Sequence, residues 1–342
     1  MDGLRVLVAD NSSVYRKMFT KAVTEEAEGA FVTCVADGAA ALELVRLNDF
    51  DIIVIDVEIP DSNIFELIRE IKREVPQVFL FLTARPLKAN ETLCLEALSA
   101  GATQYMVKPL YYSYEENLEV IKAEITSILD VISKEKEEKK SKTISTKKKT
   151  EKIGFDPEIV LIAASTGGPS ALETVIPKLK KNFPLPILIV QHMPQHFTDS
   201  LANTLDKKSE LKVKVAESGE LIMAGTVYIA PGGVHMRFRK KGTVFLDDSP
   251  PINGVRPAAD ILFESVAEDF PGEGVLSVIL TGMGYDGRTG LALLKEKKKC
   301  YCLAQSENTC VVYGMPRAVV EDGLADMILD LDKIAHEIER LC

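Results

Sequence analysis

Three residues in the second half of the chain could together carry out nucleophilic catalysis. Ser165 follows an apolar, β-branched run and precedes Thr-Gly-Gly-Pro, a pattern typical of a buried strand that turns sharply into a helix. His192 and Asp286 also follow apolar runs that are typical of buried strands. Because the carboxyl ends of parallel strands meet at one edge of a sheet, these side chains could lie together. Ser165 would then be the nucleophile, His192 the general base and later the acid, and Asp286 the group that orients the imidazole.

Each of these residues has a simpler interpretation when it is taken alone. Ser165 or Thr166 could cap the following helix, with Pro169 in its first turn. A histidine at a strand end is more often a packed residue than a base, and an aspartate that opens a helix is more often an N-cap. Their joint occurrence at strand ends favours a hydrolytic site over three unrelated structural residues.

Two glycine-rich segments flank the candidate residues. The backbone amides of Thr166 and Gly167, and those of residues 282–284, could bind the oxyanion of a tetrahedral intermediate. The second segment, Gly-Met-Gly-Tyr-Asp-Gly at 282–287, also fits the G-x-G-x-x-G pattern of dinucleotide sites, and Glu307 follows where such sites place a ribose-binding acid. An oxidoreductase that binds a dinucleotide is therefore the alternative. Against it, the aspartate of this segment would repel a pyrophosphate.

The first half of the chain carries a second group of polar residues at strand ends. The residues that follow its first, third, fourth and fifth apolar runs are Asp10, Asp56, Thr83 and Lys108. Two neighbouring carboxylates repel each other unless a hard cation such as Mg²⁺ binds them. Metal and lysine could neutralise the oxygens of a phosphoryl group, and the threonine could donate a hydrogen bond to one of them. The group therefore suits phosphoryl transfer to Asp56.

The elements that position these residues alternate between strand and helix in the first half. Apolar runs predict strands at 4–9, 31–36, 51–55, 78–82 and 104–107. Amphipathic segments predict helices near 13–27, 38–48, 63–74, 89–100 and 113–132. Five such units imply an open, doubly wound parallel sheet.

The second half repeats this alternation. Its strands are predicted near 158–163, 186–191, 226–230, 275–280 and 300–304. Its helices are predicted near 169–180, 196–206, 257–268, 286–296 and 331–341. Two shorter pieces, 234–238 and 243–246, predict a hairpin around Lys-Lys-Gly. The pattern indicates a mostly parallel sheet with helices on both faces, a three-layer α/β domain.

The strand-end motifs of the first half resemble those of a response-regulator receiver domain. The motifs, within residues 3–122, are Val-Leu-Val-Ala-Asp10, Val-Ile-Asp56-Val-Glu-Ile-Pro60, Leu-Thr83-Ala and Gly-Ala-Thr-Gln-Tyr105-Met-Val-Lys108-Pro109. The resemblance implies a flavodoxin-like fold in which a histidine kinase phosphorylates Asp56. It also implies that Mg²⁺ is held by Asp10, Asp56 and the main-chain carbonyl of Glu58.

The second half, from about residue 155 to 340, resembles the chemotaxis protein-glutamate methylesterases. Its motifs, in this order, are Ser165-Thr-Gly-Gly-Pro, Val190-Gln-His192-Met-Pro, Val227-Tyr-Ile-Ala-Pro-Gly232, Val255-Arg-Pro-Ala-Ala-Asp260, Leu280-Thr-Gly-Met-Gly-Tyr-Asp286-Gly and Val312-Tyr-Gly-Met-Pro-Arg317. The resemblance implies hydrolysis of glutamate γ-methyl esters on methyl-accepting chemotaxis receptors, with release of methanol, and deamidation of receptor glutamines. It assigns Ser165, His192 and Asp286 as the triad and places Met283 in the active-site loop. A receiver that occludes the site until it is phosphorylated belongs to the same family pattern.

The receiver resemblance further implies that Thr83, Tyr105 and Lys108 respond to phosphorylation. Two features depart from the family pattern, since Asn11 stands where a second acid is usual and the loop 61–64 lacks its usual glycine. Losing one negative ligand predicts a weaker metal site. A second hypothesis follows, in which the receiver is degenerate and the chain acts mainly by binding receptors, without phosphorylation control.

Composition excludes several classes of protein. The net charge of −10 argues against a general nucleic-acid-binding protein. No apolar run approaches the length that spans a bilayer, and the first residues show no signal-peptide pattern, which together predict a cytoplasmic protein without membrane insertion. No Cys-x-x-Cys pair occurs, and we predict buried thiols at most of the cysteines: Cys34, Cys94, Cys300, Cys302, Cys310 and Cys342.

A basic, polar segment separates the two halves. Residues 134–152 combine Lys, Glu, Ser and Thr with almost no apolar side chains, so they cannot bury enough surface to offset the entropy lost on ordering. We therefore predict a receiver domain at 1–125, a helix end and charged flexible linker at 126–152, and a catalytic domain at 153–342. The linker could also act weakly as an electrostatic tether to an acidic partner.

Overall fold

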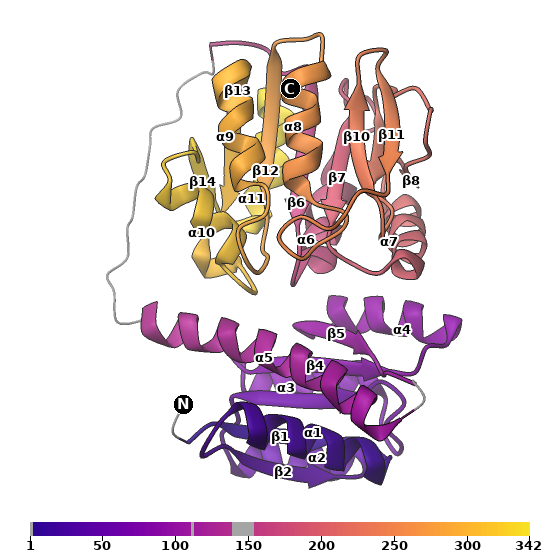
Figure 1. Cartoon of the computed structure of the whole chain (residues 1–342), viewed down its shortest axis with the longest axis vertical. Coiled ribbons are helices and arrows are strands. Elements are labelled where there is room, and N and C mark those ends of the chain that lie inside the picture. The colour runs from indigo at the N-terminus through magenta and orange to yellow at the C-terminus, as the bar shows by residue number, and fades with distance from the viewer. Residues whose placement is uncertain (1–2, 111–112, 139–153) are drawn as a thin grey trace. The chain divides into compact units, whose positions relative to one another are not determined.

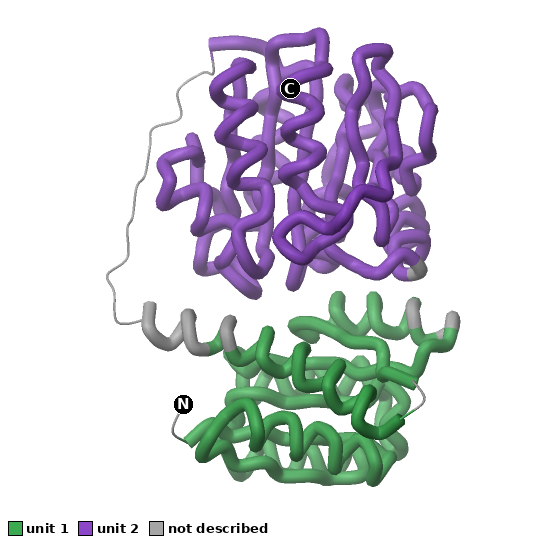
Figure 2. Tube along the Cα trace, in the orientation of Figure 1, with its two compact units in different colours: residues 1–144 green, residues 145–342 purple. Residues whose placement is uncertain are grey.

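Residues 1–144 and 145–342 form two compact α/β units (Figure 2). The computed structural model describes residues 3–110, 113–138 and 154–342. In each unit helices pack on a parallel sheet (Figure 1), so the predicted fold class is confirmed. Most of the predicted linker, residues 139–152, lies outside the described residues.

The first unit contains a five-stranded parallel sheet in the order β2-β1-β3-β4-β5. Its strands are β1 (Arg5–Ala9), β2 (Phe31–Val35), β3 (Ile52–Asp56), β4 (Phe79–Ala84) and β5 (Gln104–Val107). Its helices are α1 (Ser13–Glu26), α2 (Gly38–Leu47), α3 (Ile64–Glu74), α4 (Lys88–Ser99) and α5 (Tyr114–Glu138). β3 and β4 are buried along their whole length because they are central strands covered by helices on both faces.

The second unit contains a seven-stranded parallel sheet in the order β14-β13-β12-β6-β7-β9-β8, and a separate antiparallel hairpin. The sheet strands are β6 (Ile159–Ala164), β7 (Ile187–Gln191), β8 (Lys212–Val215), β9 (Thr226–Ile229), β12 (Gly274–Ile279), β13 (Lys299–Gln305) and β14 (Met327–Leu329). The hairpin strands are β10 (His235–Arg239) and β11 (Thr243–Asp247). The helices are α6 (Gly168–Val175), α7 (Gln195–Lys208), α8 (Ala259–Asp269), α9 (Arg288–Lys297), α10 (Gly314–Glu321) and α11 (Leu331–Leu341), with short 3-10 turns at Ile176–Lys178 and Glu307–Thr309.

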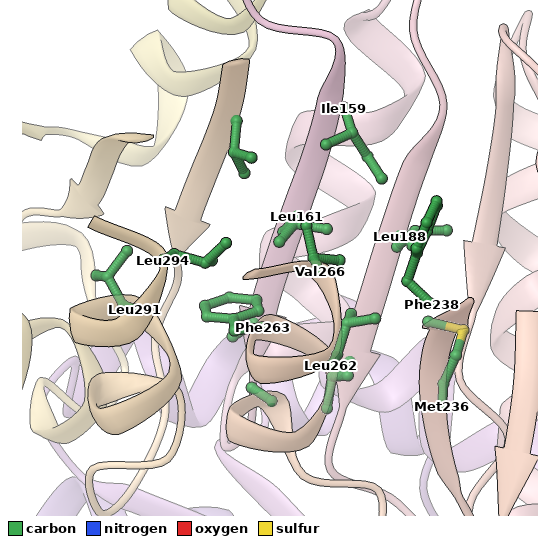
Figure 3. Packing of buried hydrophobic residues seen from close by; sticks show 14 of the residues in the cluster. Ile159, Leu161, Leu188, Met236, Phe238, Leu262, Phe263, Val266, Leu291 and Leu294 are labelled. Atoms are coloured by element: carbon green, nitrogen blue, oxygen red, sulfur yellow. The ribbon is translucent and has the colours of Figure 1, made fainter. Parts of the chain in front are cut away.

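The main core of the second unit lies between its sheet and the helices α8 and α9. One cluster of buried apolar side chains joins α8, α9 and β10 to strands β6, β7, β12 and β13 of the sheet (Figure 3). Leu161 and Leu188 of the sheet belong to the same cluster as Phe263 and Val266 of α8. α6 and α11 pack together on the opposite face of the sheet (Figure 1), which gives three layers. Burial of these apolar side chains is the main contribution that holds the layers together.

Three elements of the second unit were not predicted from the sequence, namely β8, β14 and α10. β8 reads Lys-Val-Lys-Val and β14 has three residues, so neither forms a long apolar run. Both lie at sheet edges, where pairing with an existing strand compensates for weak local preference and where lysines protect an edge from further pairing. α10 begins with Gly-Met-Pro, which resembles a turn more than a helix start.

Three smaller expectations were wrong. The first residues of the predicted linker, 134–138, continue α5. α9 begins at Arg288 rather than at Asp286, because Gly287 is its N-cap. Fewer cysteines are buried than predicted: Cys94 and Cys302 are buried, Cys34 is exposed on the edge strand β2, and the others, Cys300, Cys310 and Cys342, are half-buried. The apolar run around Cys34 signals a strand correctly, but an edge strand buries less of its surface than a central one.

Candidate active site

The predicted nucleophile lies at the point where the chain of the second unit reverses direction across the sheet. β6 leads to β7 on one side of it, and the chain later returns to β12 on the other side. Loops after β6 and β12 therefore run to opposite faces of the sheet and leave a crevice between them, where open α/β sheets place their sites. Ser165, which directly follows β6, spans this boundary because its amide donates to Thr281 O at 3.0 Å.

The turn after Ser165 depends on a glycine. Gly167 has a φ of +77°, in the left-handed region that glycine adopts without strain, and it is the N-cap of α6. Gly168 N donates to Ser165 O at 2.8 Å, which closes the turn. A side chain at Gly167 would also meet Val311, since an added Cβ would lie 2.6 Å from the Val311 Cβ. Thr166 and Gly167 therefore lie between the end of β6 and the N-terminus of α6, with Val311 packed on them.

His192 directly follows β7, the strand beside β6. The register pairs Ala164 with Gln191, so Ser165 and His192 occupy the next positions on the two strands. His192 N donates to Ala164 O at 3.1 Å and extends the ladder to this point. Adjacent parallel strands are about 4.8 Å apart, so the nucleophile and the base predicted from the sequence are neighbours.

Asp286 accepts a hydrogen bond from His192. Its Oδ2 lies 2.7 Å from His192 Nε2, and both side chains are largely buried. The same carboxylate accepts from the amides of Ala259 at 2.6 Å and Asp260 at 3.1 Å, which begin α8. Burial by itself would raise the pKa of Asp286, but the imidazole and these two amides outweigh it and lower that pKa. A carboxylate that stays ionised is therefore fixed against the imidazole.

The structure brings two of the three predicted residues into a hydrogen bond. In the described part of the chain, no hydrogen bond joins Ser165 Oγ to the imidazole of His192. Nucleophile and base contacts are often long without substrate and shorten in the reacting complex. The positions of Ser165 and His192 on paired strands make that approach a side-chain movement.

The Gly-Met-Gly loop after β12 is held by the segment before α10. Gly282 N donates to Val312 O at 2.9 Å, and Met315 N donates to Gly282 O at 2.8 Å. Met283 lies in this loop. The loop does not have the form of a pyrophosphate cradle, because its Asp286 carboxylate occupies the amides at the start of α8. Glu307, the expected ribose-binding acid, lies on an exposed 3-10 turn.

The first unit has its own polar group at an equivalent crevice. β1 lies between β2 and β3, so the loops after β1 and β3 diverge, and Asp10 and Asp56 flank that point. Lys108 Nζ lies 2.6 Å from Asp10 Oδ2 and 2.7 Å from Asp56 Oδ2, with all three side chains buried. Burial raises the pKa of Asp10, although Lys108 and the amide of Ser12 act against it. The Lys108 ammonium is thus the shared counter-charge of two buried acids.

The remaining predicted receiver residues lie on or beside strands β3, β4 and β5. Thr83 pairs with Asp56 in the β3–β4 register, and its buried Oγ1 has no hydrogen-bond partner among the described residues. Glu58 N donates to Asp56 Oδ1, while the Glu58 side chain is held by Arg85 at 2.5 and 2.6 Å. Tyr105 lies on β5. The ligands predicted from the sequence, two carboxylates and the Glu58 carbonyl, are oxygens, the hard donors that Mg²⁺ prefers.

Sequence reasoning assigned no role to three buried residues near the second site. Asp260 is buried, accepts from Gly290 N at 2.7 Å and lies beside Asp286. Gln191 is buried at the end of β7, and the polar residue that ends its apolar run was the available signal. His235 is fully buried, and its Nδ1 accepts from Ala258 N at 3.1 Å.

No helix among the described residues has both the length and the apolar character needed to cross a membrane. The described chain also lacks any cluster of three His, Cys, Asp or Glu side chains arranged to hold a metal.

These two sites and folds define a class: a response-regulator receiver domain joined to an α/β hydrolytic domain. Residues 6–122 match the response regulator receiver domain family, and residues 160–338 match the CheB methylesterase family. The chain therefore belongs to the CheB methylesterase family. Its resemblance to this family and to receivers, inferred from sequence motifs, is confirmed, and the family assignment replaces the dinucleotide interpretation.

Similar proteins support the assignment over the whole length. A protein-glutamate methylesterase/protein-glutamine glutaminase of Halalkalibacterium halodurans is 36% identical over 99% of this chain and 98% of its own. Another of that name, from Syntrophomonas wolfei, is 39% identical over 98% of each chain. The crystal structure of the Thermotoga maritima CheB methylesterase catalytic domain is 46% identical, with a TM-score of 0.53, and covers 55% of this chain and 100% of that one.

Proposed function

We propose that the second unit hydrolyses glutamate γ-methyl esters on chemotaxis receptors, with Ser165 as nucleophile, His192 as base and Asp286 as the residue that orients the imidazole. The observation that carries this proposal is the 2.7 Å contact between His192 Nε2 and Asp286 Oδ2 beside the strand end that bears Ser165. Because the ionised Asp286 accepts from Nε2, Nδ1 is left as the acceptor for the serine proton. The names of the relatives support this substrate class.

The reaction follows the chemistry of these residues. Ser165 Oγ attacks the ester carbonyl carbon as its proton passes to His192. The bond to the methoxy oxygen then breaks, His192 protonates that oxygen, and methanol leaves an acyl-enzyme. Water attacks the acyl carbon with His192 again as base and releases the glutamate carboxylate. A receptor glutamine reacts by the same route with ammonia as the leaving group, the second activity named for the relatives.

The negative charge on the tetrahedral intermediate needs donors that are already in place. We assign the amides of Thr166, Gly167 and Met283 to this role. The left-handed Gly167 and the N-terminus of α6 direct amides and a positive dipole end toward the crevice. The hydrogen bonds of Gly282 restrain the Met283 loop, so these donors reorganise little during the reaction.

The receiver supplies regulation in this proposal. A chemotaxis histidine kinase phosphorylates Asp56, and phosphorylation raises the rate of the esterase. Lys108 and the Thr83 hydroxyl, for which residues 3–110, 113–138 and 154–342 supply no hydrogen-bond partner, contact the phosphoryl oxygens. Asp10, Asp56 and the Glu58 carbonyl would hold Mg²⁺, which supplies positive charge against the phosphoryl oxygens. The phosphorylation-independent hypothesis, motivated by Asn11, is tested by measuring the esterase rate with a phosphoryl donor.

The esterase proposal is tested by methanol release from a methylated receptor fragment. Ser165→Ala should lower the rate by at least about 1,000-fold, because the nucleophile is lost. Ser170→Ala is the matched control, since it makes the same change in the first turns of α6 and should leave the rate within about twofold of wild type. Equal rates for wild type and Ser165→Ala would refute the proposal and return Ser165 to the role of a helix cap.

The receiver proposal is tested with a small phosphoryl donor. Donor and Mg²⁺ should raise methanol release by wild type but not by Asp56→Asn, and chelation of Mg²⁺ should remove the increase while sparing the basal rate. If donor gives neither an Asp56 adduct nor a rate increase at saturation, the receiver is degenerate and the phosphorylation-independent hypothesis replaces this one.

A further inference from the structure

The glutamine that ends β7 lies between the two residues that carry the proposed chemistry. Gln191 immediately precedes His192, and successive side chains of a strand point to opposite faces of the sheet. His192 meets Asp286 at the α8 side, whereas the side chain of Gln191 lies against Gly168 at the start of α6. Gln191 therefore sits beneath the crevice, on the face away from the imidazole.

Both donors of the Gln191 amide are used on the backbone of the proposed catalytic residues. Nε2 donates to Ser165 O at 2.9 Å and to His192 O at 3.0 Å. These carbonyls lie just past the ends of β6 and β7, where ladder hydrogen bonds stop. One planar amide thus joins the two strand ends at the level of the nucleophile and the base.

Ser165 is held from two sides as a result. Its amide donates to Thr281 O, and its carbonyl accepts from both Gly168 N and Gln191 Nε2. The backbone position of Ser165 is therefore fixed relative to β12 and β7 together. On the His192 side, the Gln191 bond restrains the carbonyl while Asp286 restrains the imidazole.

Gln191 lowers the stability of the folded state in a way that a purely structural residue would avoid. Its Oε1 is buried and has no hydrogen-bond partner among the described residues. An unpaired buried acceptor destabilises the folded state, and an apolar side chain of similar shape would remove that cost. Gly168 leaves room for the amide, because a Cβ there would lie 1.9 Å from Oε1. The site therefore accommodates a glutamine whose two N–H groups bind Ser165 and His192.

We propose that Gln191 is a positioning residue of the esterase site, whose side-chain amide ties the main-chain carbonyls of Ser165 and His192 together and so fixes the separation of nucleophile and base. This inference rests on the proposed triad. Gln191 touches no substrate and acts through the two residues that it joins. Its loss should slow the chemical step and leave substrate binding nearly unchanged, since small misplacements of reacting groups affect rate strongly.

The test is Gln191→Met in the full-length protein, because methionine keeps the shape and removes both donors and the unpaired oxygen. We expect kcat for methanol release to fall about 10- to 100-fold while KM stays within about twofold. The rate at which a fluorophosphonate labels Ser165, which needs no receptor, should fall in parallel. The melting temperature should stay equal or rise. Gly168→Ala is a second variant that displaces the Gln191 amide without altering it, and it should reproduce the loss of kcat.

Gln305→Met is the matched control. Gln305 is also buried at a strand end, but its amide bonds Thr281 N and Thr309 O and satisfies both of its polar atoms. We expect a lower melting temperature and a kcat within about threefold of wild type.

Two results would overturn the positioning role: a Gln191→Met kcat within about threefold of wild type, or an equal loss of kcat in Gln305→Met. Ser165→Ala separates the two proposals. If it is inactive while Gln191→Met is fully active, the positioning role alone fails. If it is active, the triad itself fails.

Discussion

Asp10 and Asp286 are buried carboxylates at equivalent places in two parallel sheets, yet their pKa values move in opposite directions. Burial raises the pKa of Asp10, whose main partner, Lys108, is shared with a second acid. Burial would also raise the pKa of Asp286, but an imidazole and two amides at the N-terminus of α8 lower it instead. The two units therefore differ at this crevice. The negative charge of Asp10 is only partly compensated in the first unit, whereas that of Asp286 is compensated in the second.

This difference matches the work that each site is proposed to do. The esterase site must keep one charge arrangement through every turnover, so permanent hydrogen bonds from a helix end suit it. The receiver site must accept and lose a phosphoryl group. Its buried acids share one cation, and the Thr83 hydroxyl has no hydrogen-bond partner in the described part of the chain, so interactions remain for the phosphoryl group and metal to complete. A parallel sheet brings buried carboxylates to one edge. The hydrogen-bond donors near each carboxylate determine whether its charge is held permanently or can change when a phosphoryl group binds.

The largest expected effect comes from removing the fixed charge. Asp286→Asn should lower kcat for methanol release by about 1,000- to 10,000-fold, because a neutral amide cannot stabilise the imidazolium and favours the wrong tautomer. Steady-state methanol assays at saturating fragment measure this change. Asp56→Asn, the corresponding change at the receiver site, should leave basal kcat unchanged. A basal loss in Asp56→Asn comparable to that in Asp286→Asn would contradict a division between fixed and switchable sites.

The second prediction concerns the shared cation. Lys108→Met should destabilise the first unit by about 3 kcal/mol, because it leaves two buried acids without a counter-charge. Calorimetry should show a lower first-unit transition, an unchanged second-unit transition, and partial recovery on adding Mg²⁺. Arg85→Met is the control, since its partner Glu58 lies nearby but the arginine is exposed, and its transition should not shift measurably. Equal shifts in the two variants would argue against an undercompensated charge.

The smallest expected effect concerns Asp260, the buried acid whose amide donates to Asp286. Burial raises the pKa of Asp260 to about 6, with the charges of Asp286 and Glu264 acting in the same direction and the amide of Gly290 against it. The folded state therefore binds a proton more tightly than the unfolded state, so the stability from this group is full below about pH 4 and is lost as pH rises through about 6.

Asp260→Asn keeps an acceptor for Gly290 N and removes this titration. The stability of the variant relative to wild type should rise by no more than about 3 kcal/mol between pH 4 and pH 7, measured by denaturant unfolding. Asp199→Asn, at an exposed position on α7, should show no such pH dependence. A relative stability for Asp260→Asn that is constant with pH would show that Asp260 does not titrate in this range.

Much of the architecture could be predicted from residue patterns. Long apolar runs such as 159–164 and 187–191 are central strands, and their sequence alone signals burial. β8, β14 and α10 were missed because their local signals are weak and the pairing partner decides the structure. The proximity of Ser165, His192 and Asp286 could be predicted because parallel sheets gather the carboxyl ends of their strands at one edge.

Residue patterns alone predict the two α/β units and the strand ends at which the candidate site residues lie. Which groups meet at those strand ends depends on the fold: Asp286 contacts both His192 and the start of α8, Lys108 contacts two acids, and Gln191 joins two strand ends. The periodicity of apolar residues indicates only which side of a single helix or strand is buried. The strength and charge state of a buried polar group depend on donors that come from distant segments, and only the folded chain brings those donors within hydrogen-bond distance.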